Sequence, residues 1–298
     1  MVSYKVVPNS SIGCAYYLNR WKVMDLLGKG TFTKVISAWD RSTSEYVAIK
    51  ISSLDEDAIH NAYNEISILD RIANDQCHII RYKYWFKEDS KGHICIVMPM
   101  LTMTLEQYLD EHKRLLDPML RMVTRQLIHG VSYLHDQIHV IHTDIKPSNI
   151  LISSLSGIDI DIKIADFNLS ICVDVATEPL THLITTIFYR SPEVLLNREW
   201  SYPTDIWSIG CTIFELATHT VLFPVYDRKF MISYICSVMG PMEDLADYKN
   251  IHPIRADRLH MIHDTNLFDM IKLCLIYDPH SRATISVLVD HPFSSSTR

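Results

Sequence analysis

The sequence predicts an α+β protein with a small antiparallel β-sheet in its first third and a larger, mainly helical part after it. Short apolar segments separated by glycine or polar turns end near residues 99–102, and apolar residues then recur at helical spacing. The chain has 298 residues, of which 48% are hydrophobic and 21% charged. This length is enough to bury a core, as one large domain or as two lobes that share a cleft. The composition excludes disorder for the bulk of the chain.

The first third predicts a β-sheet together with one helix. A glycine turn with Gly28 and Gly30 follows the first strand-like segment, and a polar turn follows the second. The segment 52–73 has helical spacing, and Ser53 with Glu56 three residues later forms a capping-box pattern near its start. Strands are expected at 21–27, 34–39, 46–51, 79–86 and 93–98, the last of them nearly all apolar and therefore central.

From residue 105 onward the apolar residues follow a helical period. The segment 205–218 is apolar almost all round, which is typical of a buried helix. The other expected helices lie at 105–112, 118–135, 229–239, 267–277 and 284–290.

Charge and cysteine usage narrow the functional classes. With 28 Lys and Arg against 35 Asp and Glu, the net charge of −7 excludes a chain that coats nucleic acid through a basic surface. No apolar window is long enough to span a membrane, and the N-terminus lacks the apolar core of a signal peptide. The seven cysteines never form a CxxC pair, which is typical of small buried residues in a reducing compartment. We therefore expect an intracellular protein without direct nucleic-acid or membrane binding.

Two features of the first third suggest phosphate chemistry. The Gly-x-Gly turn at 28–30 lets backbone N–H groups approach phosphate oxygens, although such turns also occur in ordinary hairpins. Lys50 lies in an apolar strand (VAIK), where a buried ammonium is costly without a partner. Glu65, fifteen residues later on the expected helix, is the natural counter-charge; the alternative is a lysine on a solvated strand.

The segment HTDIKPSN at 142–149 concentrates polar groups in one short loop. Asp144 can accept a proton from a hydroxyl nucleophile, Lys146 can stabilise developing phosphate charge, and Asn149 can ligate a metal through a neutral oxygen. Asp166, at the end of the apolar run in KIADF, adds the anionic oxygen that Mg²⁺ prefers. The alternative is a polar turn between strands.

The order of the motifs resembles that of the eukaryotic protein kinases over residues 21–293. The motifs are Gly-x-Gly, VAIK, Glu65, H-x-D-x-K-P-x-N, D-F-x and SPE. YRSPE at 189–193 is similar to the CMGC group, and Thr143 in HTDIKPSN resembles SR-protein kinases and LAMMER-type kinases. The resemblance implies a two-lobed protein kinase fold, with one key helix in its antiparallel N-lobe and a larger helical C-lobe. The implied parts are a short extension at 1–20, an N-lobe at 21–98, a hinge at 99–102, a C-lobe at 103–293 and a tail at 294–298.

The resemblance implies a phosphoryl-transfer site that uses ATP and Mg²⁺. Asp144 would orient the substrate hydroxyl as the base, Lys146 would contact the γ-phosphate, and Thr186 would bridge to the catalytic loop. Lys50 would hold the α- and β-phosphates and pair with Glu65. Asn149 and Asp166 would hold the metal. The residues around the nucleotide would be Leu27, Gly28, Lys29, Gly30, Thr31, Phe32, Thr33, Val35, Ala48, Lys50, Met98 and Leu101.

The resemblance also implies structural roles. Glu193 and Arg282 would form a buried ion pair, and Asp205 would cap the backbone of the catalytic loop. The acidic residues Glu243, Asp244 and Asp247 are candidates for a face that docks basic substrates, and a solvated helix start is the equal alternative.

Two departures from the family pattern bear on regulation. Thr143 replaces the arginine that usually binds an activation-loop phosphate, so activity without that phosphorylation is expected. Asn168 replaces the glycine of Asp-Phe-Gly. Asn tolerates a positive φ, so we expect the turn to persist there, but free flipping of the segment is in doubt.

The leading hypothesis is a monomeric serine/threonine kinase that phosphorylates proteins, with Arg/Ser-rich splicing factors as the expected substrates. Tyrosine phosphorylation stays open. The alternative is a catalytically silent, kinase-like scaffold that binds nucleotide and a protein partner, supported only by Asn168. A small-molecule kinase is disfavoured, because SPE at 191–193 and the long segment 167–190 are typical of a platform for an extended polypeptide.

Overall fold

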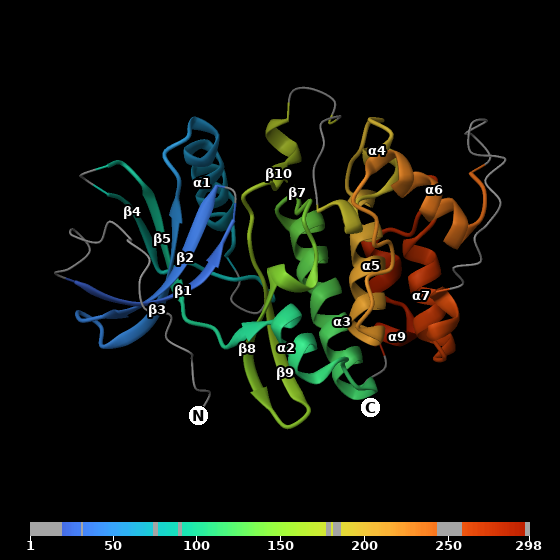
Figure 1. The fold of residues 1–298 in the computed structure, drawn as a ribbon, viewed down its shortest axis with the longest axis horizontal. Coiled ribbons are helices and arrows are strands. Elements are labelled where there is room, and N and C mark those ends of the chain that lie inside the picture. The colour runs from blue at the N-terminus through green and yellow to red at the C-terminus, as the bar shows by residue number, and fades with distance from the viewer. Residues whose placement is uncertain are drawn as a thin grey trace. The chain divides into compact units, whose positions relative to one another are not determined.

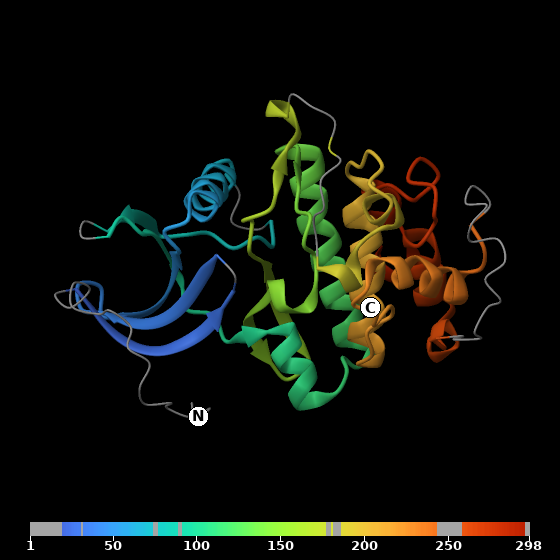
Figure 2. The ribbon, with the colours of Figure 1, turned by 45° about the horizontal axis from the view of Figure 1, so that its top comes forward.

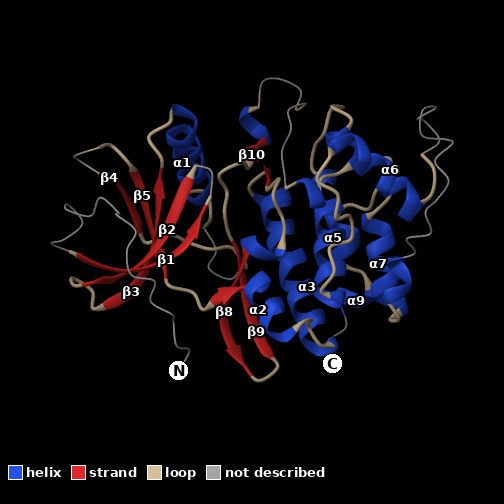
Figure 3. Ribbon diagram, in the orientation of Figure 1, coloured by secondary structure: helices blue, strands red, loops and turns tan. Residues whose placement is uncertain are grey.

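The computed structural model describes residues 20–30, 32–73, 77–88, 91–176, 180, 186–242 and 258–295. The chain divides into two compact units, one made of residues 1–73 and 80–101 and the other of residues 74–79 and 102–298. Figures 1 and 2 show the ribbon from two sides, and Figure 3 distinguishes the sheet of the first unit from the helices that dominate the second. The predicted α+β fold class is confirmed. Thr31, Glu243, Asp244 and Asp247 lie outside the described residues.

The first unit is built on an antiparallel sheet with the strand order β1-β2-β3-β5-β4. One face of the sheet forms an apolar core around Ile36, Ile49 and Val97, each without exposed surface. β5 pairs with strands on both sides, as its apolar sequence predicts. The strands are β1 (Trp21–Lys29), β2 (Thr33–Asp40), β3 (Glu45–Ser52), β4 (Tyr84–Lys87) and β5 (Ile94–Pro99).

The helix of the first unit, α1 (Glu56–Leu69), is present as predicted, but its predicted cap is wrong. The N-cap is Asp55, and no side chain caps the helix. Ser53 lies two residues too early and donates its hydroxyl to a carboxylate oxygen of Asp55 at 2.6 Å. Asp55, Glu56 and Asp57 instead place negative charge at the helix start, which the helix dipole favours.

The predicted strand at 79–86 is mostly wrong, because only residues from Tyr84 onward join the sheet as β4. Residues 77–79 belong to the second unit. There Ile79 forms a parallel bridge with Ile164, and the carbonyl of His78 accepts a hydrogen bond from the amide of Ile164 at 2.8 Å. The apolar run of this segment therefore packs on another part of the chain rather than extending β4.

The second unit is helical around α5, whose residues are buried almost throughout. α2 carries a capping box, in which the amide of Gln107 donates to the hydroxyl of Thr104 and the Gln107 side chain accepts from the amide of Thr104. The helices are α2 (Leu105–His112), α3 (Asp117–Ser132), α4 (Pro192–Leu195), α5 (Pro203–Thr218), α6 (Arg228–Met239), α7 (Thr265–Cys274), α8 (Ile285–Val289) and α9 (Pro292–Ser295). A π-helical turn (Tyr133–Gln137) continues α3, and short 3₁₀ turns cover Pro147–Asn149, Val173–Val175, Ile187–Tyr189 and Arg258–Met261.

Short strands in the second unit, which the helical reading of this part of the sequence does not predict, fix both ends of the polar loop. β8 (Ile150–Ser156) and β9 (Asp159–Ile164) form an antiparallel hairpin with β6 (Met103–Thr104) on the other side of β8. β7 (Val140–Ile141) pairs with β10 (Ile171–Cys172). The loop at 142–149 thus starts from one small sheet and ends in another, and residues 165–170 connect the same two sheets.

None of the six described cysteines forms a disulfide with another described residue, and all six are buried. Among the residues that the structure describes, no helix combines the length and the hydrophobicity needed to cross a bilayer.

Candidate active site

The backbone of the polar loop is fixed by one buried carboxylate from α5. Asp205 accepts hydrogen bonds from the amides of His142 and Thr143, both at 2.8 Å. Its Oδ2 also accepts from Nε2 of His135 at 2.9 Å. Asp205 and His142 have no exposed surface, so each of these donors would be left unsatisfied without its partner. The predicted cap by Asp205 is confirmed.

His142 connects the loop to the segment that carries Asp166. The amide of Asp144 donates to Nδ1 of His142 at 3.2 Å, and Nε2 lies 3.1 Å from the carbonyl of Ala165. Because Nδ1 accepts a hydrogen bond, the proton of the neutral ring is on Nε2, which donates to Ala165. The ring therefore fixes the backbone of Asp144, and both of its nitrogens are used in these contacts rather than in catalysis.

The carboxylate of Asp144 is oriented by donors on both oxygens. Oδ1 accepts from the amide and the hydroxyl of Thr186, each at 2.9 Å. Oδ2 accepts from Nζ of Lys146 at 2.7 Å and from Nδ2 of Asn149 at 3.0 Å. Thr186 thus bridges to the loop from 42 residues away, as predicted. The arrangement holds one carboxylate, one ammonium and one hydroxyl within hydrogen-bonding distance of one another.

Lys146 is the cation of this cluster. Its Nζ donates to the Asp144 carboxylate and, at 2.6 Å, to the Thr186 hydroxyl. Its side chain is 20% exposed, so the ammonium lies at the surface of the cluster rather than inside it. A partly desolvated ammonium in this position can stabilise negative charge that develops on a substrate beside Asp144.

The two candidate metal ligands lie at the same end of the β8–β9 hairpin. Asn149 directly precedes β8, Asp166 follows β9 by one residue, and the amide of Ala165 donates to the carbonyl of Asn149 at 2.9 Å. Nδ2 of Asn149 is used on Asp144, so Oδ1 is the amide atom suited to a cation. A neutral amide oxygen next to a carboxylate is the hard donor set that fits Mg²⁺.

Backbone strain marks Asp166 rather than Asn168. Asp166 has a φ of 69°, and among the described residues Asn168 is not one of those with a positive φ. The expected turn is nevertheless present at Asn168, closed by a hydrogen bond from the amide of Ser170 to the carbonyl of Phe167 at 3.2 Å, and it forms without a positive φ at Asn168. Thr143 also has a positive φ of 69°, which is rare for a β-branched residue and persists only where the surroundings impose it.

The segment after Asp166 is tied to the loop by consecutive hydrogen bonds. The hydroxyl of Thr143 donates to the carbonyl of Leu169 at 2.9 Å, and the hydroxyl of Ser170 donates to the carbonyl of His142 at 2.9 Å. The β7–β10 pairing continues this attachment, followed by a bond from the amide of Val173 to the carbonyl of His139. These contacts fix the start of the segment that leads to Thr186.

In the first unit, Lys50 and Glu65 form the predicted ion pair. Nζ of Lys50 lies 2.8 Å from Oε1 and 2.7 Å from Oε2 of Glu65. Their side chains are 7% and 2% exposed, so β3 and α1 are joined by a buried pair of opposite charges. A buried ammonium held this way is a fixed point charge.

The strand register places four of the predicted nucleotide-binding residues on one face of the sheet. Val35 lies opposite Lys50 in the β2–β3 pair, and Ala48 lies opposite Met98 in the β3–β5 pair. Because side chains alternate along a strand, these four share the face that is opposite to the apolar core of the sheet. One face therefore carries Lys50 together with small and apolar side chains, which suits a flat apolar ring joined to an anion.

The glycine turn leaves open space on its own side of the sheet. Gly28 lies opposite Val35, and a Cβ added to Gly28 would meet nothing within 4 Å. Leu27 lies at an irregularity of the β1–β2 ladder. The amide of Gly30 donates to the carbonyl of Thr33 at 2.8 Å, which closes the turn. Packing within the protein therefore does not require a glycine at 28, whereas the close approach of a phosphate would.

The remaining members of the predicted set are Lys29, Phe32 and Leu101. Lys29 ends β1 opposite Lys34, and Phe32 accepts a backbone hydrogen bond from Ser53 at 2.7 Å. Leu101 follows β5 and is half-buried. Sequence reasoning missed His135 and Ser170, whose partners lie 70 and 28 residues away in the chain. Neither forms a recognisable spacing with its partner, so no signal in the sequence pointed to them.

The family follows from comparison with known proteins. The sequence model of the protein kinase domain matches residues 21–294. The chain belongs to the protein kinase family. Its motifs and relatives place this kinase in the CMGC group, near the SR-protein and LAMMER-type kinases.

Several curated relatives match this kinase over nearly its whole length. It is 31% identical to the serine/threonine-protein kinase AFC3 of Arabidopsis thaliana, over 93% of this chain and 82% of the relative. It is 29% identical to the dual specificity protein kinase lkh1 of Schizosaccharomyces pombe, over 97% of this chain and 48% of the relative. It is also 29% identical to the human dual specificity protein kinase CLK1, over 92% of this chain and 66% of the relative. The chain thus spans about half of one of these relatives and most of another.

Proposed function

We propose that this kinase transfers the γ-phosphoryl group of ATP to serine and threonine hydroxyls of protein substrates. The observation that carries the proposal is the cluster in which Lys146, Asn149 and Thr186 orient the carboxylate of Asp144. Phosphoryl transfer needs little covalent chemistry from the protein and depends on positioning and charge stabilisation. This cluster supplies both in one place.

In the proposed reaction Asp144 accepts a hydrogen bond from the substrate hydroxyl and takes its proton as the oxygen attacks phosphorus. The bond between the γ-phosphorus and the bridging oxygen breaks, and ADP leaves with that oxygen. Lys146 stabilises the charge on the transferred group. Thr186 keeps the Asp144 carboxylate in register with the hydroxyl.

Several residues of the first unit would contact the nucleotide. Lys50 would contact the α- and β-phosphates, and Val35, Ala48 and Met98 would contact the adenine from the face of the sheet that they share. Asn149 and Asp166 would hold Mg²⁺. When bound, the metal would neutralise phosphate charge.

The Thr143 contact supports activity without phosphorylation of the segment between Asp166 and Thr186. In kinases that need this modification, a phosphate ordered by arginine fixes the segment. Here the hydroxyl of Thr143 bonds directly to the carbonyl of Leu169, and Ser170 bonds to His142. These bonds fix the start of the segment without a phosphate.

The proposed substrates are basic, Arg/Ser-rich proteins of the splicing type. This proposal rests on the resemblance to SR-protein kinases and on the net charge of −7, which favours encounter with basic chains. The kinase is proposed to act as a monomer.

The decisive experiment incubates the purified full chain with ATP and Mg²⁺ and an Arg/Ser-repeat peptide. Asp144→Asn is the control, and we expect it to lower kcat by about 10²- to 10⁴-fold. A degenerate peptide library run in parallel reports on serine, threonine and tyrosine. If no peptide or generic basic protein is phosphorylated although ATP binds, the chain is a nucleotide-binding scaffold instead.

A second experiment tests independence from phosphorylation. Protein made in bacteria and treated with phosphatase is expected to keep most of its activity. A fall of more than about tenfold, equivalent to roughly 1.4 kcal/mol, would contradict the proposed role of Thr143.

A further inference from the structure

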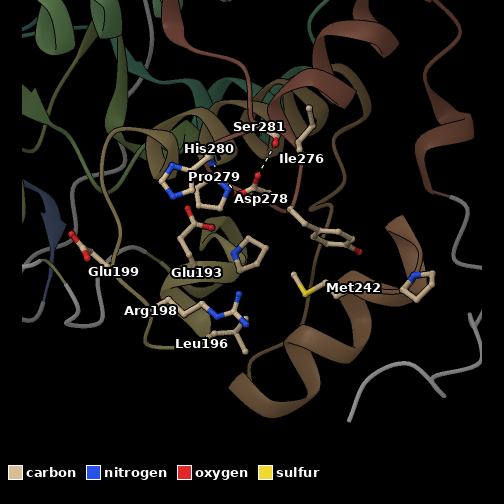
Figure 4. A pocket seen from close by; sticks show the side chains of 13 residues that line it. Glu193, Leu196, Arg198, Glu199, Met242, Ile276, Asp278, Pro279, His280 and Ser281 are labelled. Carbon is tan, nitrogen blue, oxygen red and sulfur yellow. Dashed lines mark hydrogen bonds between the residues drawn. The ribbon is translucent and has the colours of Figure 1, made fainter. Parts of the chain in front are cut away.

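A cavity of about 660 Å³ lies within the second unit (Figure 4). None of Asp144, Lys146 and Thr186 lines it. Its walls come from α4 and the residues after it, from the chain just after α6, and from the loop between α7 and α8. Its volume lies in the range of clefts that hold small organic ligands.

The walls of this cavity are mixed, and polar and charged side chains line nearly as much of it as apolar ones. The apolar part is formed by Pro192, Leu196, Pro241, Met242, Ile276, Tyr277 and Pro279. The hydroxyl of Tyr277 donates to the carbonyl of Gly240 at 2.7 Å, so its polar end is already satisfied by the protein. An apolar ligand that fills this space would gain by removing these side chains from water.

The acidic groups of the cavity are already engaged. Glu193 accepts from both terminal nitrogens of Arg282 at 2.8 and 2.9 Å, so its charge is neutralised at the base of the cavity. Asp278 accepts from the hydroxyl of Ser281 at 2.6 Å and from the amide of His280 at 3.1 Å, which closes a turn. These contacts leave neither carboxylate as an open site for a cation.

The side chains of Arg198 and Glu199, the two charged residues after α4, point in different directions. Figure 4 shows the side chain of Glu199 turned away from the other lining residues, whereas the guanidinium of Arg198 lies among them. Within the described part of the chain, no hydrogen bond or ion pair of the Arg198 side chain is found, and its backbone is fixed by a bond from its amide to the carbonyl of Glu193 at 2.9 Å. The cavity therefore combines apolar side chains with the guanidinium of Arg198, which forms no ion pair with a described residue.

We propose that this cavity binds a small amphipathic carboxylate, with its apolar body between Leu196, Met242 and Ile276 and its carboxylate on the guanidinium of Arg198. A guanidinium matches a carboxylate through two parallel N–H···O bonds, which makes arginine selective for this head group. The apolar walls alone would accept a neutral or a charged ligand, so Arg198 supplies the discrimination. This site does not depend on the proposed catalytic activity.

The test uses octanoate as the probe, titrated into the full-length protein by calorimetry. Octan-1-ol and octylammonium carry the same chain with no charge and with the opposite charge. We expect saturable octanoate binding with a Kd below about 1 mM, and weaker binding of both other probes. Shifts of the Met242 methyl resonance, assigned with Met242→Leu, locate the ligand.

Arg198→Gln keeps the shape of the side chain and removes the charge. We expect it to weaken octanoate binding about ten- to a hundredfold and to leave octan-1-ol binding within about twofold. Arg114→Gln is the matched control, because Arg114 is also exposed but does not line the cavity, and it is expected to change neither. Both positions are on the surface, so the fold is expected to tolerate the change.

Three results would overturn the proposal. One is no saturable octanoate binding up to about 1 mM, and another is equal binding by wild type and Arg198→Gln. The third is binding that leaves the Met242 resonance unchanged, which would place the ligand elsewhere. An acidic peptide that shifts this resonance where octanoate does not would assign the cavity to a protein partner instead.

Discussion

A buried ion pair lies in each unit of this kinase, and the two pairs are built differently. In the first unit Nζ of Lys50 contacts both oxygens of Glu65, at 2.8 and 2.7 Å. In the second unit Arg282 forms a bidentate pair with Glu193 at 2.8 and 2.9 Å and also donates to the carbonyls of Pro203, Ile276 and Tyr277. Both cations are below 10% exposed.

The difference separates a structural pair from one that can serve a ligand. Arg282 makes five hydrogen bonds, as many as a guanidinium has N–H donors, and they join α4, the start of α5 and the loop after α7. None of the N–H donors that bond to the backbone can be redirected to a ligand without leaving a carbonyl without its hydrogen bond. The contacts of Lys50 with Glu65 involve a single carboxylate. An ammonium has three N–H donors, so it can point one of them at a phosphate without disturbing the backbone around it.

The largest expected effect is on folding and comes from Arg282→Met. It leaves Glu193 buried without its cation and uncovers three carbonyls, so we expect a loss of about 3–5 kcal/mol in the free energy of unfolding. Urea denaturation followed by circular dichroism measures it. Arg114→Met, at an exposed position, should stay within about 0.5 kcal/mol of wild type. A loss below about 1 kcal/mol for Arg282→Met would remove the structural role assigned to this pair.

Replacing both partners sharpens the comparison. Removing both charges leaves no unpaired carboxylate or ammonium in this pair, so Lys50→Met with Glu65→Leu should regain stability to within about 1 kcal/mol of wild type. Glu193→Leu with Arg282→Met should stay destabilised by about 2–4 kcal/mol, because the part-buried carbonyls of Pro203, Ile276 and Tyr277 still lose their donors. Equal recovery of the two double variants would contradict the distinction. The same urea titrations decide it.

Catalysis is expected to depend on the Lys50–Glu65 pair. Lys50→Met should lower kcat/KM for peptide phosphorylation by about 10²- to 10³-fold, because a fixed charge at the phosphates is lost. The double variant Lys50→Met with Glu65→Leu is expected to have nearly wild-type stability. It should nevertheless be no more active than the single variant Lys50→Met. Recovery of activity in the double variant would show that Lys50 acts only through folding. Steady-state kinetics over a range of peptide concentrations below and above KM are the measurement.

The smallest expected effect concerns a neutral hydrogen bond and sets the scale for the charged ones. Thr143→Val removes the donor to the carbonyl of Leu169 and should cost about 1 kcal/mol of stability. Activity should fall several-fold, because the segment that leads to Thr186 is held less firmly. Thr143→Ser keeps the hydroxyl and is the control. If Thr143→Val and Thr143→Ser have the same stability and activity, the hydroxyl of Thr143 does not fix the segment.

Local spacing made the polar loop predictable. Asp144, Lys146 and Asn149 fall within six residues, so the chain brings them together whatever the rest of the fold does. The helix α2 (Leu105–His112) was predicted to its last residue, because its period and its ends are both written in the local sequence. The cap of α1 was not, because Ser53, Asp55 and Glu56 offer competing starts and tertiary packing selects one.

Long-range partners could be expected only through resemblance, or not at all. Thr186 and Asp205 carry no local signal for Asp144 or for the amides of His142 and Thr143, and His135 gave no pattern to follow. The apolar run at residues 79–86 was read as one strand, yet Ile79 pairs with Ile164 while Tyr84 begins β4. An apolar run records that a segment is buried and not which surface buries it.

By itself, the sequence determined the chemistry of this kinase: the residue types, their order along the chain and their attachment to strands and helices of recognisable period. The tertiary structure alone decided which donors meet the Asp144 carboxylate, that the positive φ lies at Asp166 and not at Asn168, and that Arg198 lines a partly apolar cavity. The reason is that periodicity and spacing act over a few residues. Hydrogen-bond partners and cavities depend on residues brought together only when the apolar faces have packed.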